Sequence, residues 1–377
     1  MARFSFARFV AVMIKELLQL RRDRLTFAMM VGVPVLQLIL FGFAINADPK
    51  RLPTAVLSAD NGPFARALVA AMANSGYFEV TRAAPDEAAL DRLLATGAVQ
   101  FAVTIPAGFA RDLQRGARPA LLVEADATDP AATSNALSAL AVLARQALDP
   151  ELTGPLERLR ADPDPVELRV HRRYNPEGIT QYNVVPGLIG VVLTMTMVMM
   201  TALAVTRERE RGTMENLLAM PVRPAEVMLG KIVPFVLIGY VQVLIILLAA
   251  RGLFGVPVIG SLSLLSAVLV LFIAANLAVG FTFSTVARNQ LQAMQMSVFF
   301  LLPSLLLSGF MFPFRGMPGW AQALGEILPL THFLRIVRGI LLKGNGWSEI
   351  AGEVAALAAF LAVVSAVALK RYRQTLD

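Results

Sequence analysis

The sequence predicts an α-helical polytopic membrane protein with six transmembrane helices and an inserted extracytoplasmic α/β domain. Of its 377 residues, 56% are hydrophobic and only 16% are charged, whereas soluble domains average about 25% charged residues. The apolar residues are concentrated in runs of about 20, the length that lets a helix cross the hydrocarbon core of a bilayer. A segment running from Asn46 to Val184 separates the first run from the second.

Six apolar runs are expected to span the membrane. The first carries no charged residue and no small-residue cleavage pattern follows it, so we expect a retained span and not a cleaved signal peptide. The remaining 185–377 region is then a five-helix transmembrane region. The expected spans are 25–45, 185–205, 232–250, 264–283, 294–312 and 350–369.

Basic residues predict the orientation, because cytoplasmic loops are enriched in Lys and Arg. Fifteen lie before the first span, between the second and third, and after the fourth and sixth; five lie on the opposite short loops. Both termini are therefore expected in the cytoplasm, with residues 46–184 outside the membrane, and the exported segment fits the inner (plasma) membrane of a bacterium. That segment carries 14 Lys and Arg against 17 Asp and Glu, so the overall net charge of +7 reflects membrane orientation and no nucleic-acid partner is expected.

Residues 46–184 alternate short apolar strands with helices, which predicts a small α/β domain. Strands are expected at 54–59, 77–81, 100–105 and 120–124, and helices up to Asn74, between Pro85 and Gly97, and at 131–148. The Pro-rich stretch 149–165 is expected to be a linker back to the membrane. Acidic residues follow one strand end, where open α/β sheets often bind ligands, but a solvated loop is the favoured interpretation; they are Glu124, Asp126 and Asp129.

Residues 1–24 are expected to form a cytoplasmic amphipathic helix. Apolar side chains alternate there with a basic face that includes Arg8, Lys15 and Arg22, a pattern typical of helices lying in the membrane interface. A simple positive flank for membrane insertion is the alternative.

The sequence contains no constellation for catalysis, metal binding or nucleotide binding. It has no cysteine and only two histidines, His171 and His332, far apart in the chain. The phosphate-binding pattern G-x-x-x-x-G-K-[ST] is missing, since Gly230-Lys231 is followed by Ile232. The centres of the six spans carry no Asp, Glu, Lys or Arg, which disfavours an ion-coupled carrier.

The loop 206–231, TRERERGTMENLLAMPVRPAEVMLGK, is the most informative stretch. In helical register a charged face lies beside an apolar patch, and Pro221 and Pro224 then interrupt the helix. A short helix of this kind fits a groove on a cytoplasmic partner; a solvated loop with paired charges is the equal alternative. The charged face consists of Glu208, Arg211 and Glu215, and the apolar patch of Met214, Leu217 and Leu218.

Residues 207–215, RERERGTME, with Pro221 shortly after, resemble the "RE…GT.E.L…P" signature of type-2 ABC transporter permeases. Residues 15–24, KELLQLRRDR, resemble the family's start before its first span, and 308–313, SGFMFP, with Met317-Pro318 resemble the end of its fifth span. Residues 329–333 and 338–340 resemble its next block. The resemblance covers the membrane part in order, with a large domain inserted after the first span as in the drug-exporter branch.

The resemblance implies the permease subunit of an ATP-driven exporter that moves a small amphiphilic compound or drug outward. Its partners would be an ABC ATP-binding subunit, a second permease, identical or homologous, the lipid bilayer and, as a further candidate, a periplasmic adaptor. The chain itself would be no enzyme and bind no cofactor or metal, with ATP and Mg held by the partner ATPase. An ion-coupled secondary carrier and a membrane-anchored ligand-binding scaffold are the alternatives.

The resemblance also assigns roles to segments and residues. Residues 206–220 would be the coupling helix that contacts the ATPase, and 313–347 an outer re-entrant hairpin; a peripheral hairpin with snorkelling arginines is the alternative for the latter. The expected coupling residues are Arg207, Glu208, Arg211, Gly212, Thr213, Glu215 and Pro221. The candidates for the translocation path or exit are Gln242, Asn276, Ser308, Arg335 and Arg338.

Overall fold

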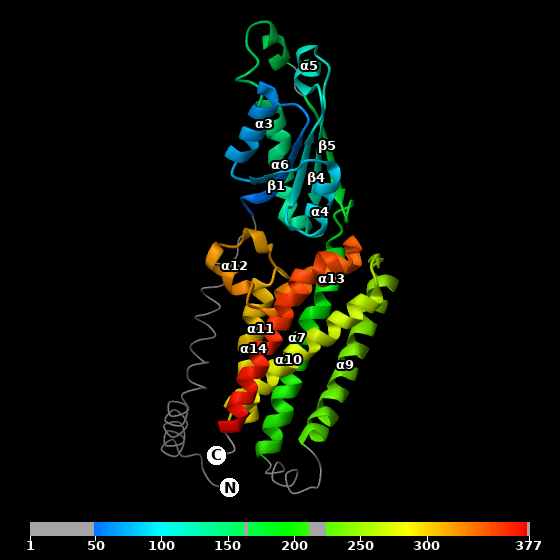
Figure 1. Cartoon of the computed structure of the whole chain (residues 1–377), viewed down its shortest axis with the longest axis vertical. Helices are drawn as coiled ribbons and strands as arrows, with labels where there is room; N and C mark the ends of the chain where they lie inside the picture. Colours follow the sequence, from blue (N-terminus) through cyan, green and yellow to red (C-terminus); the bar gives the residue numbers. More distant parts are fainter. Residues whose placement is uncertain (1–48, 162–164, 211–223, 375–377) are drawn as a thin grey trace, which may run out of the picture.

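The computed structural model describes residues 49–161, 165–210 and 224–374 and has two parts (Figure 1). An α/β unit, residues 49–173, occupies one end of an elongated molecule, and a bundle of long helices occupies the other. We call the end of the bundle next to the α/β unit proximal and the opposite end distal. The expected N-terminal helix 1–24 and first span 25–45 lie outside the described residues.

The α/β unit is built on a five-stranded sheet with the order β2-β1-β3-β4-β5. Only the β3–β4 pairing is antiparallel, and the other neighbouring strands are parallel. Consecutive side chains of β3, Phe101, Ala102 and Val103, are fully buried, as expected for a central strand covered on both faces. The strands are β1 (Leu52–Ser58), β2 (Phe78–Ala83), β3 (Phe101–Ile105), β4 (Ala120–Asp126) and β5 (Glu167–Arg173).

Four helices connect these strands, and their ends follow local capping rules. Asp86 and Asp129 each accept a hydrogen bond from a backbone N–H in the first turn of the helix that follows, which stabilises a helix N-terminus. Proline occupies the first turn of two of them, where its missing N–H costs nothing. The helices are α3 (Pro63–Asn74), α4 (Glu87–Ala95), α5 (Phe109–Gln114) and α6 (Pro130–Gln146).

The structure corrects the expected linker at 149–165. A 3-10 helix, η2 (Gly154–Ala161), lies there, and Leu152 and Val166 are buried in the core of the α/β unit. Strand β5 follows directly and completes the sheet. The apolar pattern missed β5 because its sequence, ELRVHRR, is mostly polar and most of its residues are exposed, as is common for an edge strand.

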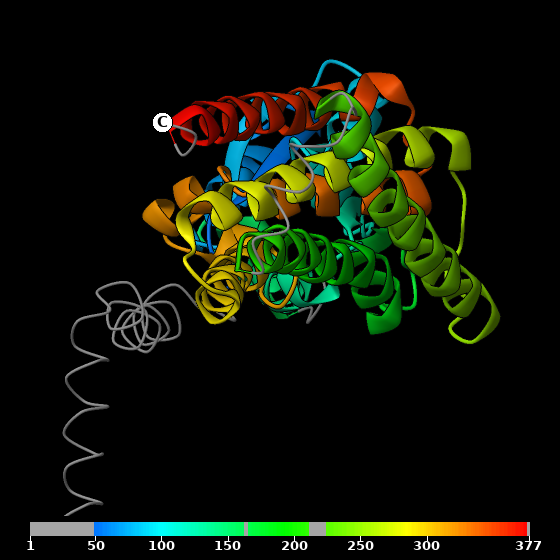
Figure 2. The ribbon, with the colours of Figure 1, turned by 90° about the horizontal axis from the view of Figure 1, so that it is seen from below.

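Within the described ranges, five helices of the bundle are long and apolar enough to cross a membrane. Viewed along the bundle, α10 lies in the middle with α7 on one side and α14 on the other (Figure 2). The expected fifth span, 294–312, ends earlier, at Leu307, because the chain turns at Gly309 with φ of 84°. The helices are α7 (Thr180–Glu210), α9 (Pro224–Gly252), α10 (Leu262–Val286), α11 (Gln290–Leu307) and α14 (Trp347–Gln374).

Helices α7 and α10 approach closely at Gly280. A Cβ added there would lie 2.5 Å from the backbone carbonyl oxygen of Val198, a distance that only movement of a helix backbone relieves. The missing side chain therefore sets the spacing of the two helices.

Short elements at the proximal end connect α11 to α14: η3 (Phe314–Gly316), α12 (Gly319–Gly325), α13 (Pro329–Arg338) and the π-helical turn η4 (Gly339–Lys343). Helix α13 packs against α7, α10 and α14, and eight of its ten residues are buried. Its Phe333 ring stacks on Phe272 of α10, with centroids 4.0 Å apart. The peripheral version of the hairpin at 313–347 is therefore wrong, because α13 is part of the bundle core.

Candidate functional site

The last turn of α7 is tied to the start of α11 at the distal end. The carboxylate of Glu210 accepts hydrogen bonds from the Gln290 backbone N–H at 2.8 Å and from its side-chain amide at 2.6 Å. The Gln290 amide oxygen in turn accepts from Nε of Arg207 at 3.3 Å. Glu210 and Gln290 were missed by sequence reasoning, because they come together only when α7 and α11 pack.

Of the expected coupling residues, only Arg207 and Glu208 lie in the described part of the chain. Arg207 is exposed and Glu208 half-buried. The other five lie outside it; they are Arg211, Gly212, Thr213, Glu215 and Pro221.

Two expected path residues make hydrogen bonds inside the bundle. The Gln242 amide oxygen accepts from the Thr196 hydroxyl at 3.0 Å and so links α9 to α7. Asn276 is fully buried on α10 and donates to the Phe272 carbonyl at 2.9 Å. Its amide oxygen is buried without a hydrogen-bond partner, which leaves one acceptor for a ligand or water.

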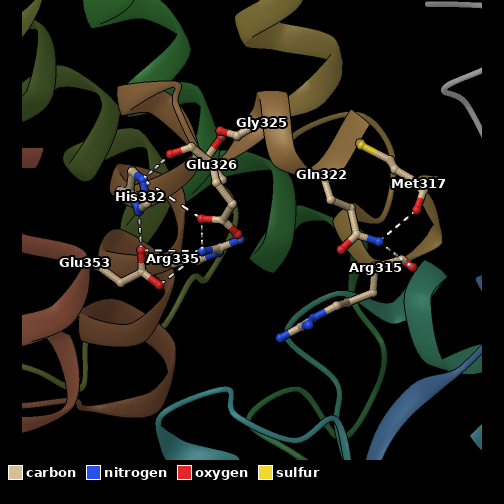
Figure 3. Close-up of polar contacts among 9 residues, drawn as sticks. Arg315, Met317, Gln322, Gly325, Glu326, His332, Arg335 and Glu353 are labelled. Carbon is tan, nitrogen blue, oxygen red and sulfur yellow. Dashed lines mark hydrogen bonds and ion pairs between the residues drawn. The ribbon is translucent and has the colours of Figure 1, made fainter. Parts of the chain in front are cut away.

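Four charged residues form what we call the α13 cluster at the proximal end: Glu326, His332, Arg335 and Glu353 (Figure 3). The Arg335 guanidinium donates to Glu326 at 2.6 and 3.0 Å and to Glu353 at 3.1 Å. Nδ1 of His332 lies 2.5 Å from Glu353, and its Nε2 lies 2.8 Å from the Glu326 carbonyl. The cluster ties α13 to α14 and to the end of α12.

Burial by itself lowers the pKa of His332, but the hydrogen bonds to Glu353 and to the Glu326 carbonyl outweigh it, and the pKa is raised. A protonated imidazole donates through both ring nitrogens, which matches the two acceptors present. Arg335, an expected exit residue, is thus engaged with two carboxylates, and its guanidinium also lies 4.7 Å from the Phe314 ring.

A second set of contacts, which we call the junction, joins the bundle to the α/β unit. Nζ of Lys343 lies 2.5 Å from Asp126 and donates to the Leu94 carbonyl at 3.0 Å. The Asn345 amide donates to the Ala95 carbonyl at 3.0 Å. The side chains of Lys343 and Asp126 are only 8% and 10% exposed, so this is a buried ion pair.

The junction overturns the interpretation of the acidic residues as a solvated loop. Asp126 bonds Lys343, and Glu124 accepts from Nε of Arg173 at 2.6 Å. Asp129 accepts from the Asn183 amide at 3.3 Å, and burial raises its pKa. Both Lys343 and Asn183 are more than 50 residues distant along the chain from these acids, so only the tertiary structure brings their partners together.

A cavity of about 200 Å³ lies at the junction, between the α/β unit and α13. Arg338 lines it and donates through Nη1 to the Gly309 carbonyl at 3.2 Å, while its Nε and Nη2 are buried without a hydrogen-bond partner. Burial lowers the pKa of Arg338, opposed by the charges of Asp129 and Asp126. Ser308 lines the same cavity with an unpartnered hydroxyl. Three expected path or exit residues, Ser308, Arg335 and Arg338, therefore line one cavity.

Among the described residues no group of three or more His, Cys, Asp or Glu side chains is arranged to hold a metal ion. Sequence reasoning missed Glu353, Lys343 and Asn345. The first two carried a signal: each is an ionisable residue inside or next to an apolar stretch, where a charge is costly unless it is paired.

The fold and these contacts define a multi-pass membrane protein with an associated α/β unit. The ABC-2 family transporter protein family matches residues 24–370, and the chain belongs to that family. It is 29% identical over 350 residues, 90% of each chain, to the "Probable multidrug ABC transporter permease YbhS" of Escherichia coli (strain K12). It is 29% identical over 338 residues, 90% of each chain, to the "Probable multidrug ABC transporter permease YbhR" of the same organism. It is also 30% identical over 350 residues to its "Inner membrane transport permease YhhJ", covering 88% of this chain and 87% of that one.

Proposed function

We propose that this chain is the membrane-spanning permease subunit of an ATP-driven exporter that moves a small amphiphilic compound or drug outward. The observation that carries the proposal is the family match over 24–370, which takes in both the α/β unit and the bundle. The names of the relatives support the substrate class, since two are called probable multidrug permeases.

The composition of the spans supports an external energy source. In the five long helices of the bundle the charged residues lie within the first eight or the last five residues, and α10 and α11 have none at all. A proton- or ion-coupled carrier needs ionisable groups within the bilayer. We therefore infer that ATP and Mg are bound by a separate ABC ATPase subunit.

Contacts at the distal end could transmit movement of the ATPase to the helix bundle. In this proposal residues 206–220 form the coupling helix against the ATPase. Because Glu210 and Arg207 both bond Gln290, a displacement of the end of α7 also moves the start of α11. Binding of ATP to the closed form of the ATPase then favours one arrangement of these helices over the other.

The proximal end would be the exit. Helix α13 and its cluster sit at the end of the bundle, and the junction cavity places Arg338 and Ser308 between the bundle and the α/β unit. The compound would pass between two permeases, along Gln242 and Asn276, and leave near Arg335 and Arg338. In this arrangement both termini are cytoplasmic, residues 46–184 are periplasmic at the inner membrane, and a periplasmic adaptor is a candidate partner of the α/β unit.

The proposal is tested first by purifying the chain from native membranes in several mild detergents and identifying stoichiometric partners by mass spectrometry. Recovery of a P-loop ATPase, alone or with a second permease, is expected. Its reproducible absence would contradict the proposal and favour an ion-coupled carrier or a ligand-binding scaffold.

Reversing one charge tests the coupling role. Glu215→Arg is expected to abolish efflux of ethidium, used as an amphiphilic probe, while membrane insertion and basal ATP hydrolysis persist. The matched control is Glu151→Arg, an exposed reversal in a turn of the α/β unit, which should leave efflux unchanged. Normal efflux by Glu215→Arg would refute the assigned contact, and efflux that stops when the proton gradient collapses at constant ATP would refute the energy source.

A further inference from the structure

A cleft of about 740 Å³ lies between the edge of the sheet and α12, next to the junction cavity, with which it shares Pro53 and Arg315 as lining residues. One wall comes from the start of β1 and from β2, which is the edge strand. The other wall is the turn from Arg315 to Gly319, together with Gln322 of α12. The Gln322 amide donates to the Met317 carbonyl at 2.7 Å and to that of Arg315 at 3.5 Å, which fixes this turn.

Four cations and a single carboxylate line the cleft: Lys50, Arg51, Arg82 and Arg315 against Glu79. We call it the basic cleft. In Figure 3 no dashed line joins the Arg315 guanidinium to the α13 cluster, and the ribbon of the α/β unit passes below it. Like charges gathered on facing walls repel one another, and an anion between them removes that repulsion. The excess of positive charge indicates an anionic occupant.

The position of the basic cleft indicates which anion. Helix α12 starts at Gly319 on the cleft wall, and next to it Trp320 is 43% exposed. Leu324 and Ile327 follow with 48% and 63% of their surface exposed. Exposed Trp with large aliphatic side chains is typical of the membrane–water interface. Helix α12 therefore carries a surface of the interfacial type next to the cleft wall, although these three side chains do not themselves line the cleft.

We propose that the basic cleft binds the phosphate headgroup of an anionic phospholipid. Arg51, Arg82 and Arg315 contact the phosphate, and the acyl chains lie along the apolar surface of Trp320, Leu324 and Ile327. A water-soluble phosphate compound would use the cations but gain nothing from that surface, which is why a lipid is the better fit. Lipid binding at this site needs neither ATP nor a transported substrate, so its test is independent of the proposed function.

The chain provides its own reporter, because Trp320 and Trp347 are its only tryptophans. In a Trp347→Phe background, Trp320 fluorescence reports on lipid beside the cleft. The full chain is reconstituted into phosphatidylcholine vesicles containing an equal minor fraction of either brominated phosphatidylglycerol or brominated phosphatidylcholine. Brominated phosphatidylglycerol is expected to quench Trp320 several-fold more strongly, with a preference that weakens at high salt.

Three substitutions test the cations. The triple variant Arg51→Gln, Arg82→Gln and Arg315→Gln should lose the preference, because each basic residue at an anionic surface contributes about fivefold in affinity. The matched control removes the same charge from exposed arginines on α3, on α5 and at the C-terminal cap of α5, with Arg66→Gln, Arg111→Gln and Arg115→Gln. It should keep the preference. Gel filtration and circular dichroism verify that both variants are folded.

Equal quenching by the two brominated lipids in the unaltered cleft would overturn the proposal. So would a preference that survives the triple cleft variant or disappears in the control. Inorganic phosphate, added alone to the detergent-purified chain, separates the two sources of the same chemistry. A thermal shift with phosphate that the cleft variant abolishes, combined with equal quenching, would assign the cleft to a soluble phosphate ligand and not to a lipid.

Discussion

The buried pair of Lys343 and Asp126 is expected to control how firmly the α/β unit docks on the bundle. Asp126→Asn removes the negative charge opposite the Lys343 ammonium, which keeps the Leu94 carbonyl, a neutral amide oxygen and the Tyr174 ring, whose centroid is 5.1 Å away. Lys343→Gln leaves the Asp126 carboxylate with Thr128 as its remaining partner. Removing one partner of a buried pair costs about 3–5 kcal/mol. Because each remaining charge keeps some hydrogen bonding, we expect about 3 kcal/mol for each variant.

That cost corresponds to a roughly 150-fold larger equilibrium constant for opening of the junction. The variant with both substitutions leaves no unpaired charge. It is therefore expected to open about as much as either single variant, and not by the product of the two effects.

Opening is measured by thiol alkylation, since the chain has no cysteine of its own. Ala132 lines the junction cavity and is 2% exposed, so Ala132→Cys reacts with a water-soluble maleimide only when the junction opens. Ser134→Cys, exposed two residues later on α6, gives the control rate and should not change. Single variants that alkylate within threefold of the parent, or strictly multiplicative effects in the double variant, would refute the reasoning.

Two further predictions concern packing and pH. Gly280→Ala is expected to destabilise the bundle by about 2 kcal/mol through overpacking against the Val198 carbonyl. Gly352→Ala on α14, where an added Cβ would have nothing within 4 Å, should be neutral or stabilise the protein by up to about 1 kcal/mol. Thermal unfolding of the two variants in detergent measures both effects, and equal losses of stability would contradict this prediction. The raised pKa of His332 adds stability that is fully present below its unfolded pKa of about 6.5 and is lost as the pH rises through the folded value. His332→Gln should therefore reduce the fall in melting temperature between mildly acidic and alkaline pH, and an unchanged pH profile would count against the assigned role.

Much of the fold follows from patterns within short stretches of sequence. Apolar runs of about 20 residues marked the helices that became α7, α9, α10, α11 and α14, because desolvating a helix requires apolar side chains on every face. The strands β1 to β4 and helix α6 likewise follow from local apolar content, proline and acidic caps. Strand β5 did not, because an exposed edge strand needs no apolar face.

For the candidate site, too, the sequence predicted some features and missed others. The resemblance that indicated a permease rests on contiguous stretches such as 207–215, and the family match over 24–370 agrees with it. Contiguous stretches of sequence did not predict which charged and polar residues pair. His332 with Glu353, Lys343 with Asp126 and Glu210 with Gln290 are separated by 21, 217 and 80 residues.

The sequence by itself determined that the chain enters a membrane, where its helices lie and to which family it belongs, since hydrophobic length and motif are properties of neighbouring residues. Only the tertiary structure decided that α13 is buried, that Asp126 and Asp129 lie in the junction and that basic side chains converge on one cleft. The physical reason is that a charge has the same sequence signature whether water or a partner compensates it. Packing alone determines which of the two is within reach.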